Sequence, residues 1–331
     1  MSNKELKKPE VSIIMNCLNS EKYLREAIDS IYAQTFTDWE IIFWDNGSVD
    51  DSPKIANSYD EKLKYFRSEE KVPLGQARNH ASENVNGKYI AFLDTDDIWM
   101  KDKLELQIPI FEKDKEVGLV FSDAVIFYQD GSVADSLYLK PNGRTPRGRI
   151  FPYAFKYFDS TFCMPTIVLR KEAFDSNKEK FKGAFHICPD FEFFLRVAYY
   201  WKCDYIDKPL ACYRVHRASV SKRHCYYVPR EIDETVDGFH KLQPDFNVIY
   251  KKEIKFYRLK VDYLAGKSLW MEGKLKEARK LFKKHLNSPK ILFVYFAAFF
   301  RFSLMENIWY YFKDAKNKIK KACAGKNIRR S

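Results

Sequence analysis

Residues 11–130 alternate between β-rich apolar runs and segments with helical spacing, and this alternation limits the possible folds more than any other feature. The apolar runs are VSIIMNC, WEIIFWD, LKYFR, YIAFLD and VGLVFSDAVIFY. Strands that are apolar on both faces are typical of a mostly parallel sheet covered by helices on both sides. The sequence therefore predicts a Rossmann-like α/β fold for this part of the chain.

Three polar clusters follow three of these strands, at residues 16–19, 45–48 and 94–97. Ligands of such sheets bind beyond the carboxyl ends of the strands, so we expect the clusters to converge on one edge. The third cluster holds Asp94, Asp96 and Asp97. Two carboxylates about 6 Å apart repel by roughly 3 kcal/mol at an effective dielectric near 20, so a divalent cation is expected. A solvated acidic turn remains the alternative from this stretch alone.

The chain carries a formal net charge of +12, and residues 313–330 hold eight Lys or Arg against a single acid. Such a balance suits phosphorylated small molecules or an anionic membrane. Nucleic acid is excluded as a partner because no RNP-like, zinc-finger or helix-turn-helix pattern is present. The 7 cysteines form no C-x-x-C pair, which indicates reduced thiols in a cytosolic protein.

We expect a flexible N-terminus over 1–9, an α/β domain over 10–222 and a helical region with a basic tail over 223–331. The polar N-terminus is not a signal peptide, and no apolar run reaches the 20 residues that a spanning helix needs. Residues 291–300 are apolar on every face, and aromatic residues such as Trp309 follow. The region 291–331 therefore predicts an interfacial helix on an anionic membrane surface. The alternative is a helix that packs against the α/β domain.

Several ordered motifs, VSIIMNCLNSEKYLREAIDSIYAQTFTDWEIIFWDNGSVDDS, PLGQARNHASENVNGKYIAFLDTDDIW, PDFEFFLRV and CYRVH, are similar to those of the family 2 glycosyltransferases. The resemblance covers roughly residues 10–220 and implies the GT-A fold. It also implies a nucleotide-sugar donor, with a UDP-sugar favoured. Finally, it implies that Mn²⁺ or Mg²⁺ assists departure of the nucleotide diphosphate.

The resemblance also assigns roles to residues at the sheet edge. Asp94 and Asp96 form the family's Asp-x-Asp motif, and Asp96 with Asp97 is expected to contact ribose and metal. Asp45 and Asn46 stand where the family usually has two acids that contact the nucleobase. These expected donor-binding residues are joined by Asn16 and Asn19 in the first loop, by Arg78, and by Arg214 and His216 over the diphosphate.

Asp190 is the expected catalytic base, because a carboxylate must remove the proton from the acceptor hydroxyl in an inverting transfer. A position in the first turn of a helix favours its ionised form. Glu192 is the second candidate. From local sequence alone, an acid that complements the helix dipole is the simpler explanation of Asp190.

Together these features predict an inverting, metal-dependent glycosyltransferase that acts on a glycan or lipid-linked acceptor. The expected setting is the assembly of surface polysaccharide or lipopolysaccharide at the inner face of the cytoplasmic membrane. A sugar-nucleotide pyrophosphorylase is less suitable because no Gly-rich loop follows the first strand. A non-catalytic nucleotide-binding or interaction module that uses the helical C-terminus is the alternative from another class.

Overall fold

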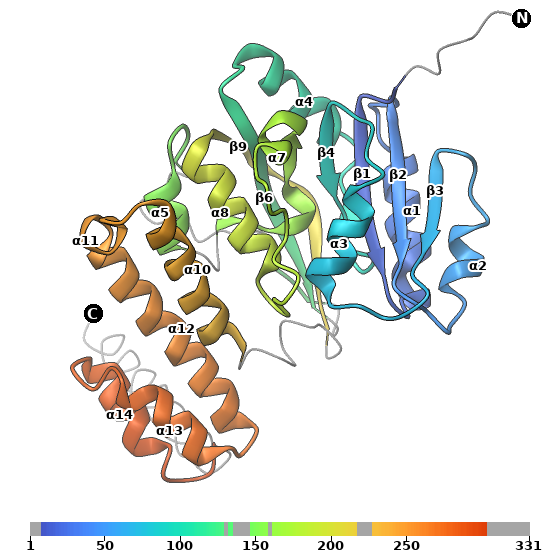
Figure 1. The fold of residues 1–331 in the computed structure, drawn as a ribbon. Helices are drawn as coiled ribbons and strands as arrows, with labels where there is room; N and C mark the ends of the chain where they lie inside the picture. Colours follow the sequence, from blue (N-terminus) through green and yellow to red (C-terminus); the bar gives the residue numbers. More distant parts are fainter. Residues whose placement is uncertain (1–7, 129–131, 135–145, 158–160, 217–226, 303–331) are drawn as a thin grey trace, which may run out of the picture. The chain divides into compact units, whose positions relative to one another are not determined.

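A computed structural model gives the structure of the chain. It describes residues 8–128, 132–134, 146–157, 161–216 and 227–302 (Figure 1). The chain forms two compact units, Met1–Arg223 with Gln243–Ile254 and His224–Leu242 with Lys255–Ser331. The expected domain boundary after residue 222 stays a prediction. The predictions for residues 1–7, Trp309 and the basic tail fall outside the described residues.

The first unit is built on one mixed sheet, which has nine strands within the described residues. Its order is β3-β2-β1-β4-β8-β6-β9-β5, and β7 pairs with β6. The strands β3, β2, β1 and β4 are mutually parallel, as predicted, whereas β8 runs antiparallel to both of its neighbours. The strands are β1 (Val11–Cys17), β2 (Trp39–Asp45), β3 (Leu63–Arg67), β4 (Tyr89–Phe92), β5 (Ile98–Trp99), β6 (Val117–Tyr128), β7 (Val133–Ala134), β8 (Val168–Arg170) and β9 (Lys202–Val215).

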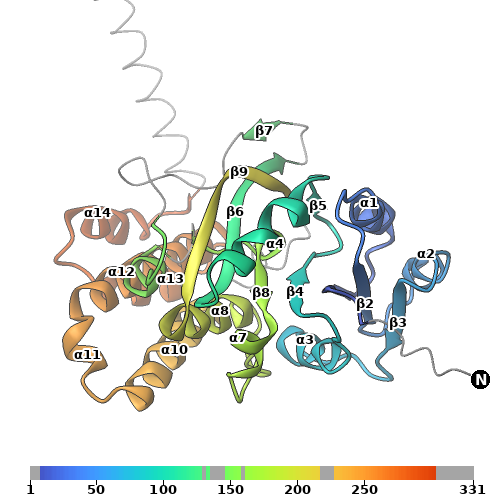
Figure 2. The ribbon, with the colours of Figure 1, turned by 90° about the horizontal axis from the view of Figure 1, so that it is seen from above.

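Helices cover both faces of this sheet, as predicted for its apolar strands. Figure 2 shows α1, α2 and α4 on one face and α3, α7 and α8 on the other. Short helices α5 (Phe151–Lys156) and α11 (Phe246–Ile249) and the 3-10 turn η2 (Met164–Thr166) complete the unit. The covering helices are α1 (Glu21–Tyr32), α2 (Ser52–Ala56), α3 (Leu74–Ser82), α4 (Lys103–Lys113), α7 (Lys171–Asp175) and α8 (Pro189–Tyr200).

Helix α1 illustrates why the sequence pattern was informative. Leu24, Ala27, Ile28 and Ile31 recur at helical spacing, and all four are fully buried. They pack into the core cluster formed with β1, β2 and β4. The buried stripe therefore fixes α1 on one face of the parallel strands.

Gly87 lies in the short connection between the end of α3 at Ser82 and the start of β4 at Tyr89. A Cβ at Gly87 would lie 2.5 Å from the backbone nitrogen of Ser12, so glycine allows the chain to enter β4 close to β1.

The second unit is helical and consists of α10 (Val228–Leu242), most of α12 (Lys251–Met271), α13 (Leu275–Lys283) and α14 (Pro289–Ala297). A short turn joins α12 and α13, and Gly273 in this turn has a φ of +79°. The core of this unit includes Trp270, Phe282 and Ile291. Among the described helices, none is long and apolar enough to cross a membrane.

Candidate active site

The register of the parallel strands brings the predicted polar clusters to one sheet edge. Cys17 at the end of β1 lies opposite Asp45 at the end of β2, and β4 pairs with the other side of β1. The loop after β4 is tied to the loop after β1 because the Thr95 hydroxyl donates to Ser20 Oγ at 2.8 Å. The topological expectation of a shared edge therefore agrees with the structure.

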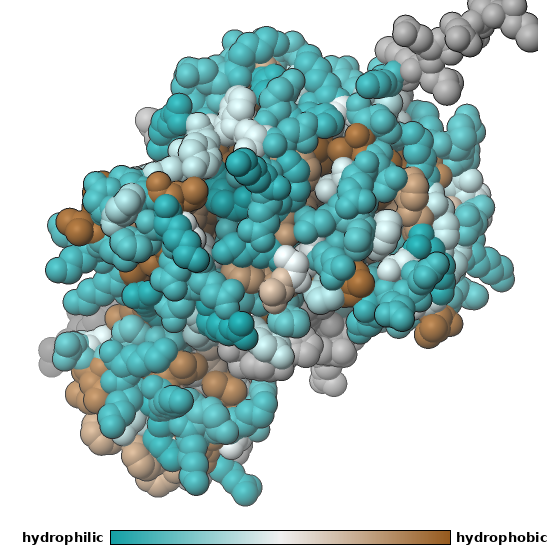
Figure 3. Space-filling view, viewed as in Figure 1, coloured by the Kyte–Doolittle hydropathy of each residue, from teal (hydrophilic) through white to brown (hydrophobic). Residues whose placement is uncertain are grey.

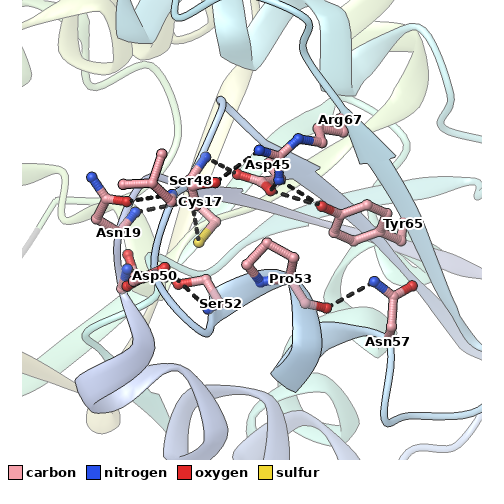
Figure 4. A network of polar contacts seen from close by, with 12 residues as sticks. Cys17, Asn19, Asp45, Ser48, Asp50, Ser52, Pro53, Asn57, Tyr65 and Arg67 are labelled. Atoms are coloured by element: carbon pink, nitrogen blue, oxygen red, sulfur yellow. Dashed lines mark hydrogen bonds and ion pairs between the residues drawn. The ribbon is translucent and has the colours of Figure 1, made fainter.

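Asp45 is fully buried at this edge, and both of its carboxylate oxygens have partners (Figure 4). Oδ1 accepts from the Ser48 N–H at 2.7 Å. Oδ2 accepts from the Tyr65 hydroxyl at 2.7 Å and from Arg67 Nη1 at 2.6 Å. Arg67 also donates to the Ser48 carbonyl at 2.8 Å. Arg67 of β3 thus balances the charge of Asp45, and the Asp45 carboxylate holds the loop after β2 in place.

The side-chain polar groups of Asn46 also form hydrogen bonds within the protein. Its side-chain NH₂ donates to the Val72 carbonyl at 2.8 Å, and its side-chain oxygen accepts from the Val72 N–H at 3.1 Å. This pair of bonds fastens the segment before α3 to the end of β2. By contrast, the side-chain nitrogen of Asn16 is buried with no hydrogen-bond partner among the described residues.

Asn19 joins the loops after β1 and β2. Its φ of 53° lies in the left-handed region, which Asn tolerates better than most residues. Its N–H donates to Ser48 Oγ at 2.9 Å, and its side-chain oxygen accepts from the Val49 N–H at 2.9 Å. Asn19 therefore shapes the loop that was expected to line the nucleotide pocket.

Arg78 lies between the acid cluster after β4 and the expected base on α8. The Arg78 side chain is only 5% exposed; Nη2 lies 3.5 Å from Asp94 Oδ1 and Nη1 lies 3.8 Å from Asp190 Oδ1. Nη1 is buried and makes no hydrogen bond to any described residue. One guanidinium group thus joins carboxylates that are 96 positions apart in the sequence (94 and 190).

Two carboxylates of this cluster, Asp94 and Asp97, have a raised pKa. Burial raises the pKa of Asp94 to about 6, with Asp96 and Asp190 adding to the effect and Arg78 opposing it. Burial also raises the pKa of Asp97 well above its usual range, and Asp96 and Asp94 contribute further. Added positive charge would therefore stabilise the ionised cluster.

Asp96 and Asp97 meet the end of β9, because β5 pairs with β9 directly after them. Asp97 Oδ1 accepts from the Arg214 N–H at 2.8 Å, and Oδ2 is buried without a partner among the described residues. The Arg214 Nε donates to the Asp96 carbonyl at 2.8 Å. His216 Nε2 and Asp96 Oδ2 are also 2.8 Å apart. The structure thus brings Arg214 of β9 and His216, which directly follows β9, to the acid cluster.

Helix α1 supplies contacts that the sequence analysis missed. Arg214 lies over the Tyr23 ring at 4.4 Å from the centroid and pairs with Glu26 at 2.7 Å. His216 packs on the same ring at 5.7 Å between centroids. Tyr23 and Glu26 are three positions apart and so lie on one face of the helix. This spacing is the sequence pattern that could have indicated a shared contact.

A second missed residue is Asp123 of β6, an acid within the apolar run VGLVFSDAVIFY. It is 5% exposed and lies at an irregularity in the β6–β9 register. The pKa of the buried Cys163 thiol is raised by burial first, and then by Asp97, Asp94, Asp190 and Asp123. Cys163 thus lies near all four carboxylates, and a buried acid in a strand could have drawn attention to Asp123.

Asp190 and Glu192 occupy the first turn of α8 but differ in availability. The Asp190 side chain is 26% exposed. Glu192 is buried, and its two oxygens accept from Arg196 Nε and Nη2, both at 2.9 Å. Lys182 lies 3.8 Å from it as well. Because Glu192 is held in this ion pair, the structure offers no support for it as the second candidate base.

The donor atoms around Asp96 and Asp97 suit a hard divalent cation, which prefers oxygen ligands. The buried, unpartnered Oδ2 of Asp97 is consistent with an additional ligand. Among the described residues, no three His, Cys, Asp or Glu side chains are placed to hold a metal ion by themselves. Mg²⁺ commonly uses one or two carboxylates together with substrate phosphates, so a shared site fits these residues better than an all-protein site.

The family model described as "Glycosyl transferase family 2" matches residues 12–196, which include every site described above except Arg214 and His216. The chain belongs to glycosyl transferase family 2. The glycosyltransferase is 29% identical to the uncharacterized glycosyltransferase MJ1057 of Methanocaldococcus jannaschii, over 78% of this chain and 89% of that one. It is 35% identical to TuaG of Bacillus subtilis, whose name assigns it to teichuronic acid biosynthesis, over 42% of this chain and 56% of TuaG.

Solved structures agree on the fold. TarS residues 1–349 of S. aureus, in complex with UDP-GlcNAc, matches with a TM-score of 0.59 at 16% identity, covering 83% of each chain. The mannosyltransferase PcManGT of Pyrobaculum calidifontis, in complex with GDP-Man and Mn²⁺, matches with a TM-score of 0.54 at 16% identity, covering 87% of this chain and 79% of that one. The predicted GT-A fold of the glycosyltransferase is thereby confirmed.

Proposed function

We propose that the glycosyltransferase is an inverting, metal-dependent enzyme that transfers a sugar from a nucleotide diphosphate donor, with UDP-sugars favoured, to a glycan or lipid-linked acceptor. The observation that carries this proposal is the position of Arg78 between Asp94 and Asp190. It joins the acid cluster at the sheet edge to a partly exposed carboxylate that can reach an acceptor. Residues 10–222 are the proposed catalytic domain, and 223–331 the separate helical region.

Asp190 is the proposed catalytic base. Its carboxylate takes the proton of the acceptor hydroxyl while the acceptor oxygen bonds to the anomeric carbon and the bond to the nucleotide diphosphate breaks. Arg78 Nη1 lies 3.8 Å from Asp190 Oδ1 and supplies a positive charge beside the proposed base. The partial exposure of Asp190 leaves room for the acceptor.

Asp96 and Asp97 are the proposed metal-binding residues, with Asp94 in support. Bound Mn²⁺ or Mg²⁺ would stabilise the negative charge of the leaving diphosphate. Arg78, Arg214 and His216 are the proposed phosphate-side contacts. Asn16 and Asn19 are proposed to line the nucleotide site. Asp45 and Asn46 are proposed to contribute to base recognition indirectly, because they hold the loops beside the nucleotide site in place.

The proposed acceptor belongs to cell-surface polysaccharide or lipopolysaccharide assembly, in line with the name of TuaG. A lipid-linked saccharide would place the enzyme at the inner face of the cytoplasmic membrane. The proposed attachment to that membrane is peripheral and uses the region 291–331.

A thermal-shift panel with UDP, GDP and dTDP, each with Mn²⁺ or with EDTA, tests donor binding. A metal-dependent nucleotide at 100 times its dissociation constant should raise the free energy of unfolding by about 2.7 kcal/mol. A shift for one nucleotide that disappears in EDTA supports the proposal, and a product assay with nucleotide sugars then identifies the sugar. No shift under any condition would favour a non-catalytic interaction module.

A further inference from the structure

A segment of the helical unit is strongly cationic. Residues 278–301 contain no Asp or Glu. Six basic residues lie in the same stretch, namely Arg279, Lys280, Lys283, Lys284, Lys290 and Arg301. Lys284 is paired with Asp262 of α12 at 3.3 Å, so the positive charge that attracts anions to this stretch comes mainly from the other five.

Helix α14 within this segment has two apolar faces, and one of them is buried. Ile291, Val294 and Ala297 are at most 9% exposed and belong to the core formed with α12 and α13. The sequence predicted that residues 291–300 are apolar on every face. Packing against α12 and α13 explains one apolar face of α14 but not the other.

The other apolar face of α14 is exposed. Five large apolar side chains, with exposed fractions between 39% and 69%, follow at helical spacing and continue past the end of the helix. They are Leu292, Phe293, Phe296, Phe299 and Phe300, and we call them the α14 stripe. Figure 3 shows hydrophobic residues gathered at the surface where Figure 1 places α13 and α14. Contiguous apolar patches of this kind mark interaction surfaces.

The end of the stripe is held in position by α12 and α13. Arg279 donates to the Ala298 carbonyl at 2.8 Å and lies over the Phe299 ring at 4.3 Å from its centroid. The Trp270 indole donates to the Phe300 carbonyl at 2.8 Å. The last phenylalanines of the stripe are therefore fixed on the surface and need little ordering before they bind a partner.

We propose that the α14 stripe inserts among the lipids of an anionic membrane, at the boundary between headgroups and acyl chains, while basic residues of the same stretch contact lipid phosphates. This inference rests on the proposed function, because it supplies the surface that brings the enzyme to a lipid-linked acceptor. Amphipathic helices with aromatic residues on one face and cations beside them bind membranes in this way.

Charge favours a lipid surface over the other possible occupants. A second copy of the chain would present the same cations in a symmetric interface, where like charges repel. The C-terminal stretch 313–330, with eight basic residues and one acid, carries the same sign of charge. Anionic lipid headgroups supply the opposite charge, and the acyl region beneath them accepts the phenylalanines.

Vesicle flotation of the full-length protein tests this proposal. Vesicles of phosphatidylcholine alone are compared with vesicles containing 3 parts phosphatidylglycerol to 7 parts phosphatidylcholine, at roughly physiological salt where the Debye length is about 8 Å. The expected result is at least about tenfold stronger partitioning onto the anionic vesicles. Equal binding to both kinds of vesicle, or binding to neither, would overturn the proposal.

The triple variant Phe293→Ser/Phe296→Ser/Phe299→Ser should lose about tenfold or more of the vesicle partitioning, because apolar burial is the main attractive term. The matched control is Leu264→Ser/Met271→Ser, which removes exposed apolar side chains of α12 outside the stripe. This control should bind vesicles as the wild type does. Retained binding by the triple variant, or an equal loss in the control, would overturn the proposal, as would a dimer that the triple variant abolishes.

The variant Phe293→Trp provides a second test that does not depend on removing core contacts, since Phe293 is 69% exposed. Its added fluorescence should shift to shorter wavelength on anionic vesicles and be quenched by brominated lipid, whereas no change would contradict insertion.

Nucleotide thermal shifts of the variants keep the two proposals separate. If a variant loses vesicle binding but keeps a normal nucleotide shift, the result bears on the membrane proposal alone. If the nucleotide shift is missing in every variant, the result bears on the proposed function.

Discussion

Two groups of carboxylates lie at the same edge of the sheet and differ in how their charge is balanced. Asp45, at the end of β2, has Arg67, Tyr65 and Ser48 as partners for its two oxygens. The cluster of Asp94, Asp96, Asp97 and Asp190 has Arg78 and Arg214 nearby, yet Asp97 Oδ2 and Arg78 Nη1 remain buried without hydrogen bonds to described residues. Asp45 is therefore fully satisfied within the protein, whereas the second cluster keeps two buried atoms that lack hydrogen-bond partners among the described residues.

This difference separates residues that maintain the fold from residues that can bind a substrate. Buried polar atoms in folded proteins nearly always have partners, so unpaired ones at a sheet edge suggest a ligand. A donor diphosphate with its cation would supply anionic oxygens to Arg78 and positive charge to Asp97. The same comparison predicts that mutations in the two groups affect different properties, activity in one and stability in the other.

The largest expected effect follows from Asp190→Asn. Transfer should fall by about 10³-fold, because general-base catalysis contributes roughly 10²–10⁴-fold. Donor binding should persist, since Asp190 is proposed to contact the acceptor. Single-turnover rates and the nucleotide thermal shift measure the two properties. Asp175→Asn, at a surface carboxylate of α7, is the control, and loss of donor binding in Asp190→Asn would contradict the role of base.

The next effect concerns Asp97→Asn. The Mn²⁺-dependent stabilisation of about 2.7 kcal/mol by saturating nucleotide should be lost, because the proposed metal ligand becomes neutral. The fold should persist, since the Asn side-chain oxygen can still accept from the Arg214 N–H. Thermal melts with nucleotide, with and without Mn²⁺, provide the measurement. A wild-type shift in this variant would refute the metal role of Asp97.

A smaller effect on a different property is expected for Asp45→Ala. The free energy of unfolding should fall by roughly 2 kcal/mol, because the buried Ser48 N–H loses its charged acceptor and the β2 loop loses its anchor. Urea denaturation measures the change. Asp51→Asn, at an exposed carboxylate of the same loop, should change stability little. A stable Asp45→Ala protein that lacks only nucleotide binding would reverse the assignment of the two groups.

The smallest effect is the pH dependence contributed by Asp94. In metal-free protein its folded-state pKa of about 6 lies above the ordinary value of 3.8. Between these pH values the folded state binds more protons than the unfolded state, so this group lowers stability as pH rises from about 4 to 6. Asp94→Asn removes that contribution and should be more stable than the wild type at pH 7, by a difference that shrinks toward pH 4.

Melting temperatures of both proteins in EDTA between pH 4 and 7 check the prediction for Asp94. The advantage of Asp94→Asn over the wild type should be smallest near pH 4 and should grow through the pH range in which Asp94 titrates. Parallel curves for the two proteins would mean that Asp94 is not the group that titrates near pH 6.

Local patterns made the parallel half of the fold predictable. The apolar runs that became β1, β2 and β4, and the stripe of α1, depend on spacing within a dozen residues. Strand β9 was missed because its 14 residues mix buried, half-buried and exposed positions without a clear period. The antiparallel direction of β8 could not be foreseen, because local sequence pattern does not set the direction in which a strand enters a sheet.

In the site, too, some features could be predicted from the sequence and others could not. Motif order pointed to the residues at the sheet edge, and the structure brings Asp94, Asp96, Asp97 and Asp190 together. The partners of Asp45 were not foreseen, because Tyr65 and Arg67 were only part of an apolar strand in the sequence. The contact between Arg78 and Asp190 was also beyond reach, since it depends on how α3 and α8 pack.

The pairing of β5 with β9 has a practical consequence for anyone who shortens this protein. A fragment that stops at residue 196, where the family match ends, would lack β9 altogether. It would expose the long edge of β6 to self-association and remove the N–H that Asp97 needs. A minimal catalytic fragment must therefore continue at least through His216, and preferably through Ile254 where the first compact unit ends.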